Sequence, residues 1–304
     1  MSDSFRGTIW GLATAALVAV PAVVRAQSEA PWAPVEQILG RTAVPQAGDV
    51  MRFNFPRRDL RVMVGDVQVK PSLALGSWVA FKRMADGQAM AMGDLVLTES
   101  EINPVISALQ AGGVAQSALH NHILRGSPST MYLHISAHGR DTDIARTIRR
   151  ALDGTKTPMD TTAPGSSAAF ELDTIALARA LGYSGKVNGG VYQVGVGRLE
   201  HIMEDGQEVP GSMGLSTSIN FQPTGGGKAA ITGDFVLLGS EVNPVIRVLR
   251  DNGIAITALH SHLIGETPTL YFMHFWANDD AMKLARGVSA ALAKTNSVKS
   301  TAAK

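Results

Sequence analysis

One stretch of this chain occurs twice and decides the fold. Residues 93–139 read GDLVLTESEINPVISALQAGGVAQSALHNHILRGSPSTMYLHISAHG, and residues 233–280 read GDFVLLGSEVNPVIRVLRDNGIAITALHSHLIGETPTLYFMHFWANDD. Matching residues lie 140 positions apart, as Asn103 and Asn243 do. A long internal repeat of this kind predicts two homologous domains, or one body with a pseudo-twofold axis.

The duplicated region extends outward from these stretches. We predict repeat 1 over residues 33–153 and repeat 2 over residues 170–294. Between them, residues 154–169 are rich in Gly, Pro, Ser and Thr, a composition that is typical of a linker. After repeat 2 we expect a disordered tail over residues 295–304.

The first 26 residues are similar to a secretory signal peptide. A polar start containing Arg6 precedes an apolar, alanine-rich run over about residues 9–24, and small residues allow cleavage after Ala26. An uncleaved N-terminal anchor is the alternative. We therefore expect a periplasmic or secreted protein. Because the chain has no cysteine, a lipid anchor at this site is excluded.

The composition excludes several classes of protein. The chain has 304 residues, of which 45% are hydrophobic and 17% are charged, and its formal net charge is +1. A near-neutral chain without a run of Lys or Arg argues against nucleic acid as a partner. The absence of cysteine rules out disulfides, thiolate nucleophiles, Cys-ligated zinc and iron–sulfur clusters. After residue 26 no stretch is long enough to span a membrane.

Turn signals and periodicity within each repeat predict a mixed α+β fold. A short helix opens each repeat, over residues 35–39 and over residues 172–181. Strands follow, with hairpin turns expected at residues 85–88 and 224–227.

The quoted stretches begin with a helix and continue with strands. We predict that the helix starts near Pro104 in repeat 1, with Asn103 as its N-cap. Strands are expected over residues 114–122 and 130–138. A last helix is indicated in each repeat by apolar residues four positions apart: Ile144, Ile148 and Leu152, and Leu284, Val288 and Leu292.

Seven of the eight histidines lie in two short windows, and His201 is the exception. Repeat 1 contains His120, His122, His134 and His138, and repeat 2 contains His260, His262 and His274. Residues two apart on a strand face the same side, about 6.6 Å apart, so a His-x-His pair can bind one metal ion. If the following strand is antiparallel, His134 or His274 reaches the same face.

Three imidazoles with an open coordination position are typical of a catalytic zinc site, and also suit iron, copper or nickel. We therefore predict metal ligands at His120, His122, His134, His260, His262 and His274, with a divalent transition metal, zinc first, as cofactor. A metal-free polar cluster acting in acid–base chemistry and plain packing are the alternatives.

Other residues could support or complete such a site. His138 shares the strand face of His134, and Asn278 is its equivalent, so both could orient the ligands. Glu266 follows His262 by four residues, whereas repeat 1 has Gly126 at that position, so the two sites are not expected to be equal.

Glu101 and Glu241 recur in the two repeats, and together with Glu266 they are our candidate catalytic residues. Glu101 and Glu241 either lie in the first turn of a helix, where the helix dipole favours a negative charge, or reach the histidines. Arg58 and Arg198 also recur, for an anionic ligand or, more simply, for salt bridges.

The two quoted stretches resemble the LppY/LpqO family, a bacterial domain family of unknown function whose namesakes are exported lipoproteins. The resemblance covers nearly the whole chain after the leader and implies export and two tandem copies. It implies no established activity. The pattern of the family has Glu at the position of Gly126, and the lipoprotein cysteine is absent here.

These observations lead to one main hypothesis and several alternatives. We expect an exported, soluble protein of unassigned activity that binds a divalent transition metal, with repeat 2 as the better site. A non-catalytic module for a small molecule or a cell-envelope ligand, with structural histidines, is one alternative. A metal-dependent hydrolase or redox enzyme is another, and metal storage or delivery is a third.

Overall fold

The computed structural model describes residue 1 and residues 32–160 and 169–299. Residues 32–160 and 169–299 belong to one compact unit. The predicted signal peptide, apart from Met1, lies outside the described residues, as do residues 161–168 of the predicted linker and residues 300–304 of the predicted tail. None of the helices in the described part is long and apolar enough to cross a membrane.

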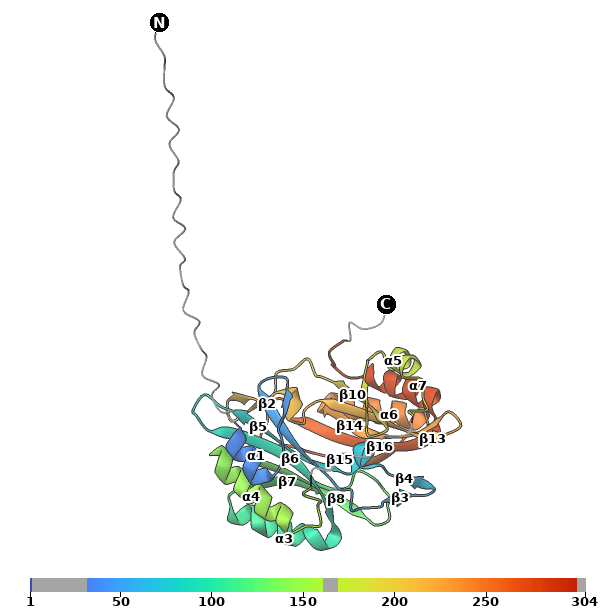
Figure 1. Ribbon diagram of the computed structural model, residues 1–304. Coiled ribbons are helices and arrows are strands. Elements are labelled where there is room, and N and C mark those ends of the chain that lie inside the picture. The colour runs from blue at the N-terminus through green and yellow to red at the C-terminus, as the bar shows by residue number, and fades with distance from the viewer. Residues whose placement is uncertain (2–31, 161–168, 300–304) are drawn as a thin grey trace. The chain divides into compact units, whose positions relative to one another are not determined.

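Each repeat forms a six-stranded antiparallel sheet (Figure 1). In repeat 1 the spatial order is β1 (Val44–Gln46), β2 (Val50–Pro56), β5 (Gly76–Arg83), β6 (Ala89–Thr98), β8 (Thr130–Gly139) and β7 (Ala115–His120). In repeat 2 it is β9 (Lys186–Asn188), β10 (Val191–Val196), β13 (Thr217–Gly225), β14 (Lys228–Leu238), β16 (Leu270–Asp280) and β15 (Ala255–His260). Both predicted hairpin turns are found, between β5 and β6 and between β13 and β14.

Three helices cover one face of each sheet. Repeat 1 uses α1 (Ala33–Leu39), α3 (Glu99–Ala111) and α4 (Asp141–Asp153). Repeat 2 uses α5 (Thr174–Leu181), α6 (Gly239–Asp251) and α7 (Ala281–Leu292). The apolar residues expected on the last helix of each repeat are buried. The predicted α+β class with two similar copies is therefore confirmed.

Strand β6 explains how each sheet comes to be buried on both faces. Alternate side chains point to opposite faces of a strand. Leu95 and Leu97 pack among the helices, whereas Met90, Met92 and Val96 lie in apolar clusters that contain residues of both repeats. The face without helices therefore looks toward the other repeat.

Each repeat also packs an insertion against the sheet of the other repeat. The insertion of repeat 1 contains β3 (Met63–Val64), β4 (Val67–Gln68) and α2 (Pro71–Ala74). The insertion of repeat 2 contains β11 (Met203–Glu204), β12 (Gln207–Glu208) and the 3-10 helix η1 (Gly211–Met213). Apolar side chains of the two insertions are buried among sheet residues of the opposite repeat.

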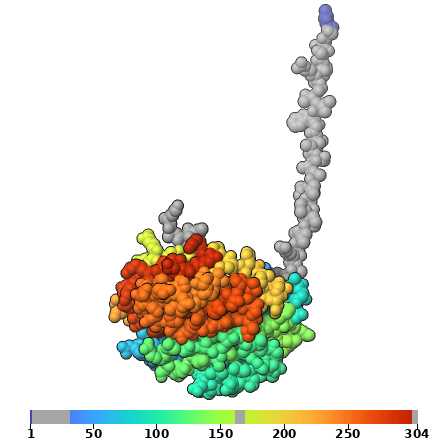
Figure 2. All heavy atoms as spheres, turned by 180° about the vertical axis from the view of Figure 1, so that it is seen from behind, coloured from blue at the N-terminus to red at the C-terminus, as the bar shows by residue number. Residues whose placement is uncertain are grey.

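Hydrogen bonds strengthen this exchange between the repeats. The side chain of Gln222 on β13 accepts from the backbone N–H of Lys70 at 2.9 Å and donates to the carbonyl of Gln68 at 2.8 Å. The hydroxyl of Ser212 donates to the carbonyl of Ala47 at 2.7 Å. Seen from behind, repeat 2 in orange and red lies directly against repeat 1 in cyan and green (Figure 2).

The predicted start of the helix near Pro104, with Asn103 as its N-cap, was wrong. Helix α3 begins at Glu99, so Asn103 is not its N-cap and Pro104 lies inside the helix. The reason is Glu101, whose carboxylate accepts from the backbone N–H of Thr98 at 2.8 Å and so supports an earlier start.

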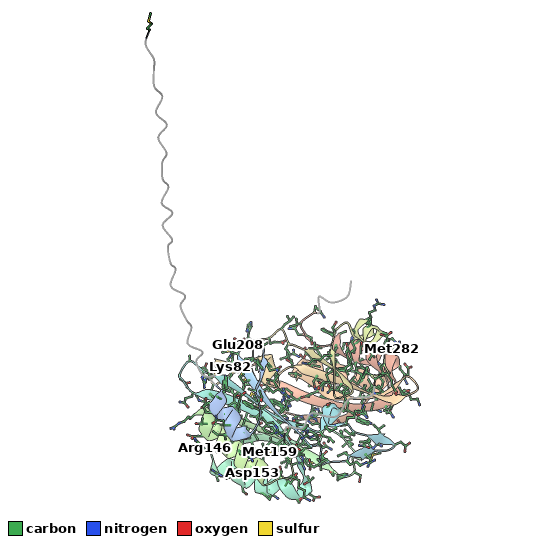
Figure 3. The ribbon with its side chains drawn as sticks, viewed as in Figure 1. Lys82, Arg146, Asp153, Met159, Glu208 and Met282 are labelled. Carbon is green, nitrogen blue, oxygen red and sulfur yellow. The ribbon has the colours of Figure 1, made fainter. Side chains whose placement is uncertain are left out.

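The ordered chain also continues past the predicted ends of both repeats. Thr157 and Ser297 are buried, although we had placed them in the linker and the disordered tail. Arg41 donates at 2.6 Å to the carbonyls of Pro158 and Met159, and Met159 lies beside the helices of repeat 1 (Figure 3).

Candidate histidine centre between the repeats

The pairing of strands brings the predicted ligands of each repeat together. In repeat 1, His134 on β8 pairs with Asp94 on β6 and with Ala118 on β7. His120 lies two residues beyond Ala118, so its side chain emerges on the same face. The same face carries Val96, two residues beyond Asp94 on β6. Because Val96 lies in an apolar cluster shared by both repeats, this face is turned toward the other repeat.

Repeat 2 has the same register. His274 on β16 pairs with Asp234 on β14 and with Ala258 on β15, and His260 pairs with Phe272. Strands β7 and β15 end at His120 and His260, so His122 and His262 lie in the loops that follow.

A β-bulge in each edge strand connects the two repeats. The register shifts between Gln116 and Ala118 in β7, and at the equivalent place in β15. The bulged residues are Ser117 and Thr257. The Ser117 hydroxyl donates to the carbonyl of His262, and the Thr257 hydroxyl donates to the carbonyl of His122 at 2.7 Å. These reciprocal bonds fix the His-containing loop of each repeat against the edge strand of the other.

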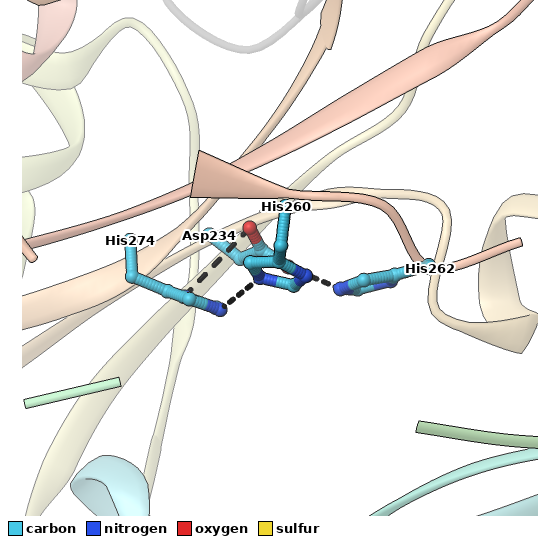
Figure 4. A group of neighbouring side chains, drawn as sticks. All are labelled: Asp234, His260, His262 and His274. Carbon is cyan, nitrogen blue, oxygen red and sulfur yellow. Dashed lines mark hydrogen bonds and ion pairs between the residues drawn. The ribbon is translucent and has the colours of Figure 1, made fainter. Parts of the chain in front are cut away.

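Six imidazole rings meet where the two faces come together. Across the boundary, the ring centroids of His120 and His260 are 3.6 Å apart. Two further cross-repeat pairs have centroid distances of 3.7 Å: His122 with His274, and His134 with His262. Exchanging the two repeats converts one of these pairs into the other, so their equal distances are expected of a pseudo-twofold axis that passes between His120 and His260. Figure 4 shows the half of this histidine centre that repeat 2 contributes.

An aromatic ring closes each end of the histidine centre. The ring of Tyr132 stacks on His122 at 3.6 Å, and Phe272 stacks on His262 at 3.4 Å. Here the two repeats differ chemically, because the hydroxyl of Tyr132 donates to the carbonyl of Ala74 at 2.7 Å. The aromatic rings and the cross-repeat packing cover the histidines, and His274 is 0% exposed.

Burial favours the neutral form of five imidazoles of the centre. Removal from water disfavours the charged form, and this lowers the pKa of His120 to about 4 even though Asp94 favours the cation. For the same reason the pKa values of four more histidines lie well below the usual range: His122, His134, His262 and His274. Burial raises the pKa of Asp234, although the neighbouring histidines oppose this effect.

Hydrogen bonds fix which ring nitrogen faces the middle of the centre. Nδ1 of His274 lies 2.8 Å from the carbonyl of Gly233, and Nδ1 of His260 lies 3.0 Å from the carbonyl of Ser261. A carbonyl oxygen only accepts, so Nδ1 carries a hydrogen in both rings. The neutral ring of His274 therefore presents its Nε2 lone pair toward Nε2 of His260, 2.9 Å away.

Six buried polar atoms of this centre have no hydrogen-bond partner among the described residues. They are Nε2 of His120, His122, His134 and His262, and Oδ1 of Asp94 and Asp234. Four side chains of repeat 2 place ligand atoms within 4.8 Å of one another: Asp234, His260, His262 and His274. Two mixed groups meet the same criterion, His120 with His122 and His274, and His120 with His134 and His260.

These donors fit a divalent transition metal. Neutral imidazole with Nδ1 bonded to a carbonyl is the usual form of a histidine ligand. Ligands at about 2.0–2.1 Å from one ion, at tetrahedral or octahedral angles, are about 2.9–3.4 Å apart. The separation of 2.9 Å between the Nε2 atoms of His260 and His274 agrees with this range.

The recurring glutamates lie elsewhere, in the first turns of α3 and α6. The carboxylate of Glu101 accepts from the two terminal guanidinium nitrogens of buried Arg57, at 2.7 and 3.1 Å. The carboxylate of Glu241 accepts in the same way from Arg198, at 2.8 and 3.1 Å. Burial works against the charge of Glu101, but the bonds from Arg57 and the backbone outweigh it and lower its pKa. Of our two interpretations, the structure thus shows first-turn acids.

The equivalent of Arg198 is Arg57, and our pairing of Arg58 with Arg198 was wrong. The two arginines occupy the same place, because each also donates to a backbone carbonyl of the central strand, Val96 or Val236. Their offset is 141 residues and not 140, so this part of the repeat differs by one residue. Arg58 instead pairs with Asp160.

The remaining predicted residues lie outside the centre's ligand groups. His138 is half exposed and its Nε2 is 3.2 Å from Asp86 at the β5–β6 turn. Asn278 accepts a hydrogen bond from Thr224 at 2.8 Å, at the corresponding turn of repeat 2. Glu266 is buried and accepts from the backbone N–H of Leu270 at 2.8 Å.

Our prediction of ligands omitted two carboxylates that the structure places in the centre. Asp94 and Asp234 lie 3.4 and 3.3 Å from Nε2 of His122 and His262, respectively. Their signal in the sequence was recurrence at the constant offset, together with an acidic residue inside an apolar strand, where a charge needs a partner.

Comparisons with known proteins give limited information. No curated protein matches this chain. Three solved structures show a distant likeness: a trimeric bacterial microcompartment shell protein, PduB (14% identity, 86% of this chain and 96% of that chain, TM-score 0.24), EtuB from Clostridium kluyveri (9%, 83% and 89%, 0.21), and MSM0271, a double ringed trimeric shell protein from the RMM microcompartment (15%, 68% and 82%, 0.20). TM-scores this low carry no argument about this chain.

A family model gives the clearer result. It matches residues 33–154 and residues 175–294, which together make up most of the chain and correspond to the two repeats. This chain belongs to the family described as Domain of Unknown Function (DUF1259) and contains two tandem copies of its domain.

Proposed function

We propose that this chain binds a divalent transition metal ion in the histidine centre, with Asp234, His260, His262 and His274 as the principal ligands. The observation that carries the proposal is the convergence of one ligand atom from each of these four side chains within 4.8 Å, where Nε2 of His262 and Oδ1 of Asp234 are buried without a hydrogen-bond partner. Zinc is the first expectation, and iron, copper or nickel would suit the same ligands.

Energetics support a cation. A buried polar atom without a partner costs about 1–3 kcal/mol, so the two such atoms in the ligand group of repeat 2, Nε2 of His262 and Oδ1 of Asp234, together cost about 2–6 kcal/mol. The net stability of a folded protein is about 5–15 kcal/mol. A metal bound in this group would turn this cost into coordination bonds, which gives a physical reason for keeping the cluster.

The burial of the centre narrows what the metal could do. His274 is 0% exposed and His262 is 5% exposed, whereas Asp234 and His260 are partly exposed, so only a small molecule is expected to reach the ion. Among our hypotheses this favours holding a metal, or chemistry on a small molecule, over binding of a cell-envelope polymer at the ion.

We also propose that the protein is exported, as its leader sequence and its resemblance to the LppY/LpqO family suggest. A mature protein that begins at Gln27 is expected, and N-terminal sequencing of protein isolated from the cell envelope fraction would check this. A chain that keeps its leader would contradict cleavage.

Elemental analysis tests the metal proposal directly. The protein is purified from its native compartment without chelators, alongside a His260→Ala/His262→Ala double variant. A matched control is His201→Ala, because His201 is exposed and pairs only with Glu208 in the described structure. We expect a transition metal in the wild type and the control, and its loss in the double variant. Wild-type protein without metal, which takes up none on reconstitution, would refute the proposal.

A further inference from the structure

We infer that the two repeats build one metal centre, in which His120 of repeat 1 adds a ligand to an ion held by repeat 2. This inference rests on the metal binding proposed above and states which residues share the ion. The alternative is two independent sites, one in each repeat.

The first argument comes from the overlap of the candidate ligand groups. The group of repeat 2 shares His274 with one mixed group and His260 with the other, and the two mixed groups share His120. An imidazole Nε2 has one lone pair and binds one ion at a time. An ion in any of these groups therefore takes a ligand away from the other two, so the groups are overlapping positions within one centre.

The second argument is the distance between the repeats at this point. The rings of His120 and His260 stack with their centroids 3.6 Å apart, closer than His120 lies to His134 in its own repeat, at 4.9 Å. The cross-repeat bonds from Ser117 and Thr257 hold the two His-containing loops in this position. An ion beside His260 therefore lies within reach of His120.

The third argument is charge. Asp94 and Asp234 are the two carboxylates that lie against the described histidines of the centre. Two carboxylates balance one divalent cation. Two such ions would leave two positive charges uncompensated in a buried site, which is costly. The charges thus favour a single ion for each chain.

Titration of the chelator-treated full chain with zinc ions, followed by calorimetry and elemental analysis, tests this sharing. We expect one equivalent of zinc in the wild type, and an affinity at least about tenfold lower in His120→Ala, since loss of a partner that only orients a ligand already costs about 10–100-fold. The matched control in repeat 1 is His138→Ala, because His138 lies half exposed at a turn, and it should bind as the wild type does.

A measurement on the wild type alone guards against a variant that does not fold. In a ¹H–¹⁵N imidazole NMR titration, one equivalent of zinc should shift signals of histidines from both repeats together. Two equivalents of zinc, an unchanged affinity in folded His120→Ala, or shifts confined to one repeat would overturn the inference while leaving metal binding intact. A wild type that binds no zinc would instead refute the metal centre itself.

Discussion

In the absence of any bound metal, the protein should lose stability steeply as the pH falls below about 6.5. The pKa of His120 drops from 6.5 to about 4 on folding, because burial disfavours the imidazolium ion. The unfolded chain therefore binds a proton between these two values that the folded chain does not. Unfolding takes up protons, and acid favours the unfolded state.

The magnitude follows from the shift. Each pKa unit corresponds to about 1.4 kcal/mol, so His120 alone should cost about 3 kcal/mol of unfolding free energy by about pH 4. The lowered pKa values of His122, His134, His262 and His274 act in the same direction. The raised pKa of Asp234 acts in the opposite direction, because its carboxyl group holds a proton more firmly in the folded state. Five histidines against one carboxyl leave a net loss.

Urea denaturation followed by circular dichroism would measure this loss, in the presence of a chelator and in steps from about pH 7 to pH 4.5. The slope of unfolding free energy against pH, divided by about 1.4 kcal/mol, counts the protons taken up. We expect a slope of more than one proton near pH 5, and a smaller slope in His120→Asn. An unfolding free energy that stays level over this range would show that the centre is not the buried, neutral cluster described above.

Two further substitutions, each with a matched control, test the frame around the centre. Glu241→Ala should destabilise the protein by about 3–5 kcal/mol in urea melts, because its buried arginine partner loses a counter-charge, whereas exposed Lys283→Ala should cost no more than about 1 kcal/mol. Gly233→Ala should lower the melting temperature and disturb the centre, because a Cβ would lie 2.0 Å from the carbonyl oxygen of Ser218 on the paired strand. Gly195→Ala, with nothing within 4 Å, should be nearly neutral, and equal melting temperatures for the two glycine variants would contradict this explanation.

Much of the fold could be predicted from the sequence because local signals agreed with the repeat. The apolar periodicity around Ile148 recurs around Val288, and the glycine-containing turns also occur in both repeats. The prediction for one repeat therefore supported the prediction for the other. The start of α3 was misplaced because Asn103-Pro104 is a strong local start signal, yet the capping bond from Glu101 operates one turn earlier.

The histidines of the centre were predictable as a set, but their arrangement was not. Strand periodicity indicates which residues share a face, and it predicted that His120 and His122 lie together. His134 joins His120 because the next strand is antiparallel. Periodicity carries no information on what that face packs against. The contact of His120 with His260 arises where the two repeats pack together. The insertions take part in this packing, and their two-residue strands, such as β3 and β11, are too short to give a periodic signal.

The reciprocal bonds from Ser117 and Thr257 have a consequence for how this chain can evolve. They are the contacts of an isologous dimer, here present within a single polypeptide. In a homodimer every mutation appears on both sides of the axis. In one chain the sides change separately, as Tyr132 and Phe272 already show, so one half of the centre can acquire a new property while the other half preserves the old one.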